Sequence, residues 1–279
     1  MTEELAALYV VPTPLGNLAD LTRRAETVLR EVPWIAAEDT RHSAPLLKQL
    51  GARARMLPAH QHNEREAAQR IIEKLQAGES VALISDAGTP GISDPGARVV
   101  AEVRAAGGKV VPLPGACAAI TALSAAGLTD EQFLFYGFLP SKSAQRRQIL
   151  GDLQAQTAAL VFYEAPHRVL DTVADLASVL GARTLVIARE LTKLFESIHS
   201  GPLAEASAWL QADSNRQRGE FVLIVSGASA ASDDAEGERV LRLLLADGLP
   251  VKQAAKLAAA ISGVAKNALY ELALRLKDE

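Results

Sequence analysis

The chain has 279 residues, a mass of 29.5 kDa, 49% hydrophobic and 22% charged residues, which excludes an intrinsically disordered protein and suits one large or two medium domains. The net charge of −4 gives no support for nucleic-acid binding by composition, so such a role must rest on local patches. The single cysteine, Cys117, excludes a disulfide within the chain and a cysteine-rich zinc site.

The same features predict a cytoplasmic protein with no membrane-spanning part. One cysteine favours a reducing compartment. The first four residues, Met-Thr-Glu-Glu, include two acids, whereas a secretory signal peptide begins with a basic region. The longest weakly polar stretch, 115–128, is shorter than the roughly 20 residues that a membrane helix needs.

Short apolar runs alternate with helical patterns through the first half of the chain. The predicted strands lie at residues 8–11, 34–37, 80–85 and 109–113, and the predicted helices at 18–32, 64–76, 99–106 and 116–126. Strands joined by helices of this length favour parallel βαβ units with right-handed crossovers. We therefore assign residues 1–138 to an N-terminal α/β domain.

A polar, proline-marked break at residues 139–143 opens the second half. Predicted strands at 159–163, 184–188 and 220–225, with helical patterns between them, favour a mixed sheet in a second α/β domain at 139–226. The Gly-, Ser- and Ala-rich segment 227–237 is typical of a linker. Residues 238–279 are helical in pattern and form a third domain.

The standard nucleotide-binding and hydrolase motifs are not found. The sequence has no G-x-G-x-x-G, no G-x-S-x-G and no H-E-x-x-H. Residues 91–98 have the glycine spacing of a P-loop, but Ala97 and Arg98 replace the Lys and Ser/Thr that bind phosphate and Mg²⁺.

Three glycine-rich turns, at residues 12–17, 86–91 and 114–118, each follow a predicted strand directly. Ligands of open α/β sheets bind at the carboxyl ends of the strands, and glycine allows the backbone to approach them closely. Asp86, at a strand end, can accept hydrogen bonds from a ligand ammonium or hydroxyl. Each turn alone is also explained as an ordinary βα turn; three together favour one shared site.

These turns belong to a longer set of motifs by which the chain resembles the tetrapyrrole-methylase superfamily of S-adenosylmethionine-dependent methyltransferases, and within it the RsmI family of 16S rRNA ribose 2′-O-methyltransferases. The motifs lie at residues 9–18, 37–41, 62–64, 85–96, 112–115, 135–140, 163–168 and 188–193, with a further similarity at the C-terminus. The string 85–96, SDAGTPGISDPG, is very specific. One departure is Cys117, where a serine is common after Pro-Gly-Ala.

The resemblance implies two α/β domains of the tetrapyrrole-methylase type with a cofactor cleft between them, plus a small all-α helix-turn-helix-like domain. It implies S-adenosylmethionine as cofactor, a homodimer, and as substrate a cytidine of the 16S rRNA decoding region, within the small ribosomal subunit. No DNA partner is expected. Carried over by position, the cofactor residues are Leu15, Asp86, Gly88, Ile92, Ser93, Gly115, Ala116, Tyr163 and Phe221.

Methyl transfer to a ribose hydroxyl needs an aligned oxygen and assistance in removing a weakly acidic proton. A lysine with a lowered pKa, held near a carboxylate, can act as base or stabilise the alkoxide. We expect Lys193 in this role, oriented by Glu190 or Glu196, with Asp39 as a further catalytic candidate. Surface ion pairs of little energetic consequence explain the same charges equally well.

Other polar clusters are candidates for substrate binding. These are Arg41, His62, Glu64, His167 and Arg168. His60, His62 and Glu64 have a spacing that can ligate a metal, but one short cluster is weak support and no metal is expected.

The C-terminal segment 250–276 reads as helix, turn, helix, with the turn at 261–264. From residue 248 to 277, five Lys and Arg face one acid, a local charge of +4 that favours RNA binding by Lys252, Lys256 and Lys266. A helical hairpin that docks on its own chain or on a second copy remains an alternative. For the whole protein, the alternatives are a methylase of small tetrapyrroles and a helix-turn-helix regulator that senses a ligand.

Overall fold

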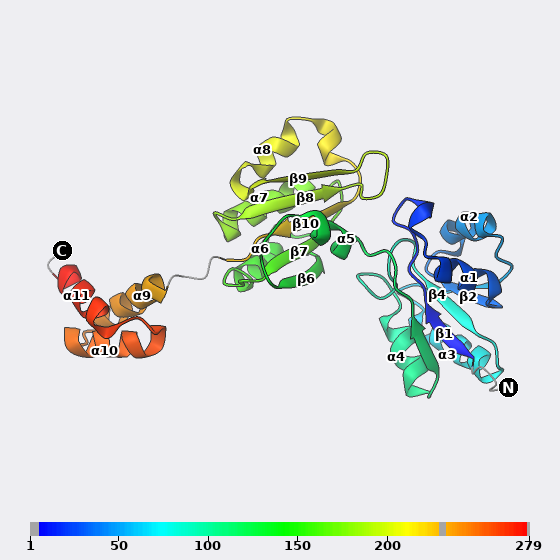
Figure 1. Ribbon diagram of the computed structural model, residues 1–279, viewed down its shortest axis with the longest axis horizontal. Helices are drawn as coiled ribbons and strands as arrows, with labels where there is room; N and C mark the ends of the chain where they lie inside the picture. The colour runs from blue at the N-terminus through cyan, green and yellow to red at the C-terminus, as the bar shows by residue number, and fades with distance from the viewer. Residues whose placement is uncertain (1–5, 229–232, 278–279) are drawn as a thin grey trace.

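The computed structural model describes residues 6–228 and 233–277, which form two α/β units and a group of three helices (Figure 1). The acidic residues 1–4 and the centre of the predicted linker, 229–232, lie outside the described residues. Within the described ranges, no helix combines the length and the apolar character needed to cross a membrane.

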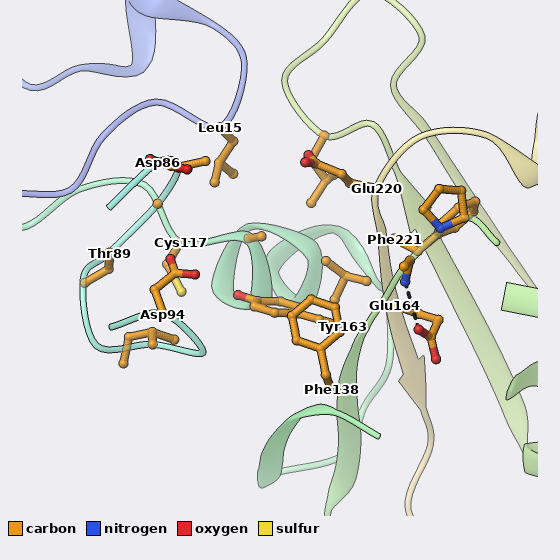
Figure 2. A pocket seen from close by; sticks show the side chains of 18 of the residues that line it. Leu15, Asp86, Thr89, Asp94, Cys117, Phe138, Tyr163, Glu164, Glu220 and Phe221 are labelled. Atoms are coloured by element: carbon orange, nitrogen blue, oxygen red, sulfur yellow. Dashed lines mark hydrogen bonds between the residues drawn. The ribbon is translucent and has the colours of Figure 1, made fainter. Parts of the chain in front are cut away.

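The first unit is built on a five-stranded sheet in the order β3-β2-β4-β1-β5, in which all neighbouring strands are parallel. The strands are β1 (Ala7–Val10), β2 (Trp34–Ala37), β3 (Arg55–Pro58), β4 (Val81–Ile84) and β5 (Lys109–Pro112). The central strand β4 is buried along its whole length, as expected for an apolar run covered on both faces. The loops that follow β1 and β4 form one wall of a cavity (Figure 2).

Helices cover both faces of this sheet and confirm the predicted alternation of strands and helices, although the helix at Thr40–Leu50 and strand β3 were not predicted. The helices are α1 (Arg23–Glu31), α2 (Thr40–Leu50), α3 (Glu64–Gln76) and α4 (Ala97–Ala105), with a short 3-10 turn at Leu18–Asp20. Leu29 and Leu47 pack α1 and α2 against one face, whereas Ile71 and Val103 pack α3 and α4 against the other. The helix predicted at 64–76 is confirmed with the same ends.

The second unit is the predicted mixed sheet, in the order β6-β7-β10-β8-β9. The strands are β6 (Phe133–Phe138), β7 (Ala159–Glu164), β8 (Thr184–Arg189), β9 (Ser197–Pro202) and β10 (Phe221–Val225); β6 and β7 are parallel and the other neighbours are antiparallel.

The predicted domain division is wrong for strand β6 (Phe133–Phe138). The prediction assigns residues up to 138 to the N-terminal domain, but β6 belongs to the second sheet. Its hydrogen bonds to β7 place it in the second sheet, and helix α5 (Ala118–Ala125) packs on the same sheet. The chain therefore leaves the first sheet after β5. The proline-marked break used as the boundary is the turn between β6 and helix α6 (Ser143–Asp152).

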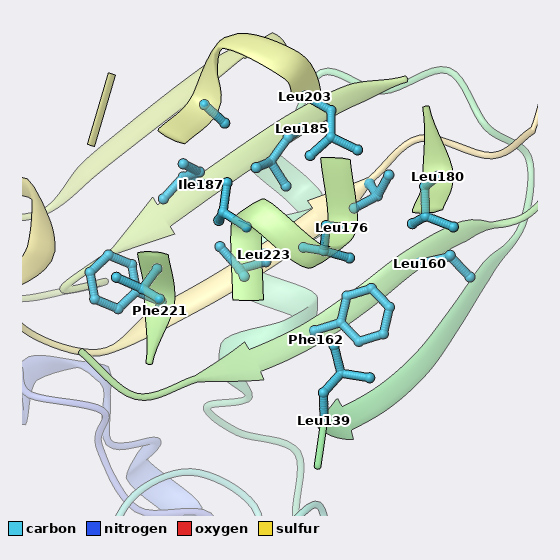
Figure 3. Close-up of a cluster of buried hydrophobic side chains, with 14 of the residues drawn as sticks. Leu139, Leu160, Phe162, Leu176, Leu180, Leu185, Ile187, Leu203, Phe221 and Leu223 are labelled. Carbon is cyan, nitrogen blue, oxygen red and sulfur yellow. The ribbon is translucent and has the colours of Figure 1, made fainter. Parts of the chain in front are cut away.

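Alternation along the strands of the second sheet supplies its two cores. On β7, Leu160 and Phe162 face helices α6, α7 (Val169–Leu180) and α8 (Ala206–Gln211) (Figure 3). Ala159 and Val161 face α5 on the other side of the sheet. Each large apolar side chain that is fully buried in this way contributes about 1.5–3 kcal/mol to stability. The sheet is thereby fixed on both faces and can hold polar side chains at its strand ends.

The C-terminal helices α9 (Asp233–Ala246), α10 (Val251–Ser262) and α11 (Lys266–Lys277) form a small unit with its own core. Gly263, in the left-handed conformation at φ 77°, ends α10 and begins the turn, which confirms the predicted helix, turn, helix. The predicted linker extends to residue 237, but helix α9 begins at Asp233.

Candidate functional site

Loops at the carboxyl ends of β1 and β4 are fixed to one another by main-chain hydrogen bonds. The N–H of Thr13 donates to the carbonyl of Gly88 and the N–H of Gly88 donates to that of Thr13, each at 2.9 Å. Gly88 has a φ of +83°, which disfavours a side chain there. Since both polar main-chain groups of Gly88 are already paired, its role is to shape the loop rather than to bind a ligand through its backbone.

A cavity of about 500 Å³ lies between these loops and the strand ends of the second sheet (Figure 2). The first unit lines it with Leu15, Glu38, Asp86, Ala87, Gly88, Thr89, Ile92 and Asp94, and the following segments with Cys117, Ala118, Phe138, Tyr163, Glu164, Ala165, Pro166, Leu191, Glu220, Phe221 and Val222. Its volume falls within the range of sites for small organic ligands.

The N-terminal wall of the cavity is acidic. Burial, together with the charges of Glu38 and Asp86, raises the pKa of Asp94 to about 6. Burial and the charge of Asp86 likewise raise the pKa of Glu38. None of the described residues that line the cavity is basic. Three carboxyl groups without a cation among them favour a ligand that carries positive charge.

The opposite wall is aromatic. The Tyr163 hydroxyl accepts a hydrogen bond of 3.1 Å from the N–H of Ala119 at the start of α5, and burial raises the pKa of that hydroxyl. The ring of Tyr163 meets Phe135 and Phe138 edge to face, with centroids 5.0 and 5.7 Å apart. Phe138 is 51% exposed and lines the cavity, so it offers an apolar ring to a ligand.

Lys193 lies at the rim of the cavity, between two carboxylates. Its Nζ donates to Glu190 at 3.0 Å and to Glu220 at 2.8 Å. Its methylene chain packs against Gly16, where an added Cβ would lie 2.5 Å from Cγ of Lys193. Lys193 therefore joins the loop after β1 to the second unit.

The lowered pKa expected for Lys193 is wrong. Partial burial alone would lower the pKa of the ammonium, but the hydrogen bonds to Glu220 and Glu190 outweigh burial and raise it. For Glu190, partial burial would raise the pKa, but the bonds from Lys193 and from the Glu220 N–H lower it. Lys193 is thus a protonated donor, because two acceptors stabilise its charged form.

The other two catalytic candidates hold local backbone. Glu196 accepts the N–H of Thr192 at 2.5 Å, and the partners found for Lys193 are Glu190 and Glu220. Asp39 caps the start of α2 by accepting the N–H of Arg41 at 2.8 Å, and its hydrogen bonds with Arg41 lower the pKa of the Asp39 carboxyl to about 2. Asp39 does not line the cavity, but its N–H donates to Asp86 at 3.2 Å.

The predicted substrate residues divide into exposed and structural groups. The side chains of Arg41, His62 and His167 are exposed. Glu64 accepts the N–H of Gly96 at 2.8 Å and so holds the 85–96 loop. Arg168 donates to the carbonyl of Leu139 at 2.6 Å and forms an ion pair with buried Glu164 at 3.1 Å. Its guanidinium is therefore used in contacts within the protein.

Metal binding finds no support in this region. Glu64 is turned toward Gly96, and the rings of His60 and His62 meet edge to face with centroids 6.1 Å apart. Throughout the described part of the chain, no three His, Cys, Asp or Glu residues are grouped so as to hold a metal ion.

Of the nine expected cofactor residues, six line the cavity: Leu15, Asp86, Gly88, Ile92, Tyr163 and Phe221. The other three, Ser93, Gly115 and Ala116, are not among its lining residues. The carbonyl of Ala116 accepts the Thr89 hydroxyl at 2.8 Å, an added Cβ at Gly115 would lie 2.6 Å from Pro12, and Ser93 abuts Gly137 of β6.

Some lining residues were not singled out from the sequence, namely Asp94, Phe138 and Glu220. Asp94 and Phe138 lie inside recognised motifs, which was the available signal. Glu220 had none, because its partner Lys193 is 27 positions away in sequence.

Known structures share this arrangement of two sheets. The methyltransferase CobJ superposes with a TM-score of 0.60 at 19% identity, over 80% of this chain and 95% of that one. Uroporphyrin-III C-methyltransferase from Thermus thermophilus, complexed with S-adenyl homocysteine, gives 0.57 at 18% identity, over 79% and 97%. The fold is therefore that of a two-domain α/β methyltransferase.

The sequence comparison is more specific. A model of the tetrapyrrole (corrin/porphyrin) methylases matches residues 7–207, and a model of the RsmI C-terminal HTH domain matches residues 231–277. The chain belongs to the tetrapyrrole methylase family. It is 54% identical over 270 residues to ribosomal RNA small subunit methyltransferase I of Escherichia coli O157:H7, covering 96% of this chain and 94% of that one. The protein of the same name from Pseudomonas aeruginosa is 55% identical over 273 residues, or 96% of each chain.

Proposed function

We propose that the chain methylates 16S rRNA within the small ribosomal subunit, at the ribose 2′-oxygen of a cytidine of the decoding region, with S-adenosylmethionine as methyl donor. The sequence identity of 54–55% to small subunit methyltransferases, over nearly the whole of both chains, carries this proposal. It includes the C-terminal helices, which a methylase of small tetrapyrroles does not need. A regulator that only senses a ligand has no comparable support.

The cavity fits the proposed cofactor chemically. S-adenosylmethionine carries a sulfonium and an ammonium, and these suit the carboxylates of Glu38, Asp86 and Asp94. Its adenine suits the apolar and aromatic wall formed by residues such as Phe138 and Tyr163. When bound, the cofactor supplies a methyl group attached to a good leaving group.

Lys193 is the residue best placed to act on the reacting hydroxyl. Because Glu190 and Glu220 keep its ammonium protonated, Lys193 would act by donating a hydrogen bond to the reacting oxygen, and the hydroxyl proton would pass to solvent water. Glu190 positions Lys193 through a bond that is itself braced by the N–H of Glu220. The acidic cavity excludes phosphate, so only the ribose edge of a nucleotide is expected to approach.

The tail contributes affinity for RNA in this proposal. Lys252, Lys256 and Lys266 are exposed on α10 and α11, where they can neutralise phosphates. We also propose a homodimer, as is usual for this family, and a cytoplasmic site of action, where small subunits are assembled. Light scattering at micromolar concentration tests the dimer, and a monomer mass contradicts it.

The decisive experiment incubates purified protein and labelled S-adenosylmethionine with small subunits that lack the modification. We expect label in 16S rRNA at one ribose, mapped by the protection that a 2′-O-methyl group gives against alkaline cleavage. Subunits that are already modified serve as the control. Label in a tetrapyrrole and none in rRNA would transfer the assignment to the alternative methylase.

A further inference from the structure

The loop between β8 and β9 exposes two apolar side chains to solvent. Leu194 is 89% exposed and Phe195 is 67% exposed, the largest fractions among the large hydrophobic residues of the described chain. Phe195 has no ring partner among the described aromatic contacts. Exposing two neighbouring apolar side chains costs hydration free energy, so a contact that covers them would be favourable.

The loop is held in one conformation although its tip is exposed. Glu190 and Thr192 have φ values of 51° and 66°, two of the three positive values among described non-glycine residues. The Arg189 guanidinium donates to the carbonyl of Phe195 at 3.1 Å, and Glu196 accepts the N–H of Thr192. Strained backbone that its surroundings enforce clusters at functional sites, and here the fixed backbone reduces the cost of ordering the loop when a ligand covers Phe195.

The tip continues directly from the rim of the cavity. Leu191 lines the cavity, and Lys193 packs on Gly16 and donates to Glu220, another lining residue. Phe195 follows two residues later. Figure 1 shows the β8–β9 loop on the side of the second sheet that faces the first unit.

A cationic group lies beside the loop. The Arg189 side chain donates to the carbonyl of Arg218 at 3.2 Å, which fixes the segment before β10 against the loop, and the Arg218 side chain is exposed. Phe195 and Arg218 lie on two segments that the Arg189 side chain holds together, and both side chains are exposed. An apolar ring and a cation on adjoining segments match a nucleotide, with the base on the ring and the phosphate on the cation.

We propose that Phe195 is a stacking platform for an unpaired base of the RNA substrate, at or next to the methylated nucleotide, with Arg218 contacting the adjoining phosphate. This inference rests on the proposed function, because it takes RNA as the substrate. An unpaired base that leaves its stack to let its ribose enter the cavity gives up stacking energy, and an aromatic surface at the opening compensates for that loss. Phe195 is a positioning residue: it touches the substrate but not the reacting atoms.

The test compares three variants of Phe195 in the full-length protein. Phe195→Trp keeps a stacking ring, Phe195→Leu keeps apolar area without a ring, and Phe195→Ala removes both. With undermethylated small subunits, we expect KM to rise roughly fivefold or more for the Leu and Ala variants and to stay near wild type for Trp. Calorimetric affinity for S-adenosylmethionine should be unchanged in all three, and Arg218→Gln should raise KM and reduce its salt dependence.

Two controls separate the possible failures. Light scattering on each variant detects a role in contact between copies of the chain: if Phe195→Leu keeps wild-type KM while Phe195→Ala changes the mass, the loop is an interface and the proposal is wrong. Equal KM values for all variants also overturn it. If the wild-type protein methylates no rRNA, the proposed function is wrong instead. This result comes from the wild-type assay alone and does not depend on the variants.

Discussion

Cofactor affinity should weaken as the pH falls through 6, because of the carboxyl groups of the cavity. The pKa of Asp94 is raised to about 6 in the free protein, so near that pH it exchanges its proton. A cationic ligand stabilises the ionised form and lowers this pKa in the complex. Affinity contributed by the Asp94 charge is therefore complete above about pH 7 and is lost progressively below 6.

The size of the effect follows from competition between proton and ligand. The apparent dissociation constant rises by a factor of about 1 + 10^(6 − pH), which gives about a tenfold loss, or about 1.4 kcal/mol, between pH 7 and pH 5. This is an upper limit, since solvent reaches part of Asp94 and screens its charge. Near pH 6, binding should release about half a proton.

Isothermal titration calorimetry measures both quantities. Titrations from pH 5 to 8 give the affinity profile, and buffers of different ionisation enthalpy give the number of protons released. Asp94→Asn should flatten the profile, whereas Asp152→Asn, an exposed carboxyl at the end of α6, should leave it unchanged. A wild-type profile that is flat, with circular dichroism showing an intact fold, would refute the assignment of an acidic cofactor wall.

Four further outcomes test the site and the tail. Gly88→Val forces a branched side chain to a φ of +83°, 3.4 Å from Leu15, and should weaken cofactor binding at least about tenfold while far-UV dichroism stays native; unchanged affinity contradicts this role for the loop. Lys193→Met should lower kcat about a hundredfold or more with cofactor affinity retained, and an equal loss of affinity would make Lys193 a binding residue. A chain ending at Gly227 should still bind cofactor, since the α/β cores contain no residue of α9–α11. Its methylation of small subunits should fall at least about tenfold. If this chain loses cofactor binding instead, the helices α9–α11 have a structural role. In the full chain, replacing Lys252, Lys256 and Lys266 with Gln should reduce the log–log salt slope of RNA binding by about 0.7–0.9 for each phosphate that is no longer neutralised, and an unchanged slope contradicts RNA binding by these lysines.

The strands that could be predicted from the sequence are those that are buried and therefore apolar along their length. β2 and β4 are apolar along their length, and the structure places them where predicted. β9, with the sequence SIHSGP, was not predicted, because it is an edge strand whose alternate residues face solvent. Residues 197–202 form a strand because they are hydrogen-bonded to β8, and the local sequence contains no pattern that predicts this pairing.

The site was predictable where one loop carries it and not where distant segments meet. Asp86 and Gly88 lie in a single specific string, and both line the cavity. The pairing of Lys193 with Glu220 depends on the register of β10 beside β8, which brings Glu220 next to Glu190. The pKa of a lysine depends on such partners. The direction in which the pKa of Lys193 is shifted therefore could not be predicted from the residue type alone.

The surfaces outside the cavity can be separated from the cavity itself. Methyltransferases at 15–19% identity share the two sheets with this chain, and a shared fold does not by itself determine the substrate. In this chain, the fixed β8–β9 loop at the opening and the helices α9–α11, which have a core of their own, provide surface outside the cavity. A large RNA substrate needs binding surface far from the reacting ribose, and its affinity can then be altered without disturbing the cavity. For this reason variants of the loop and tail should change KM, whereas variants of the acidic wall should change cofactor affinity.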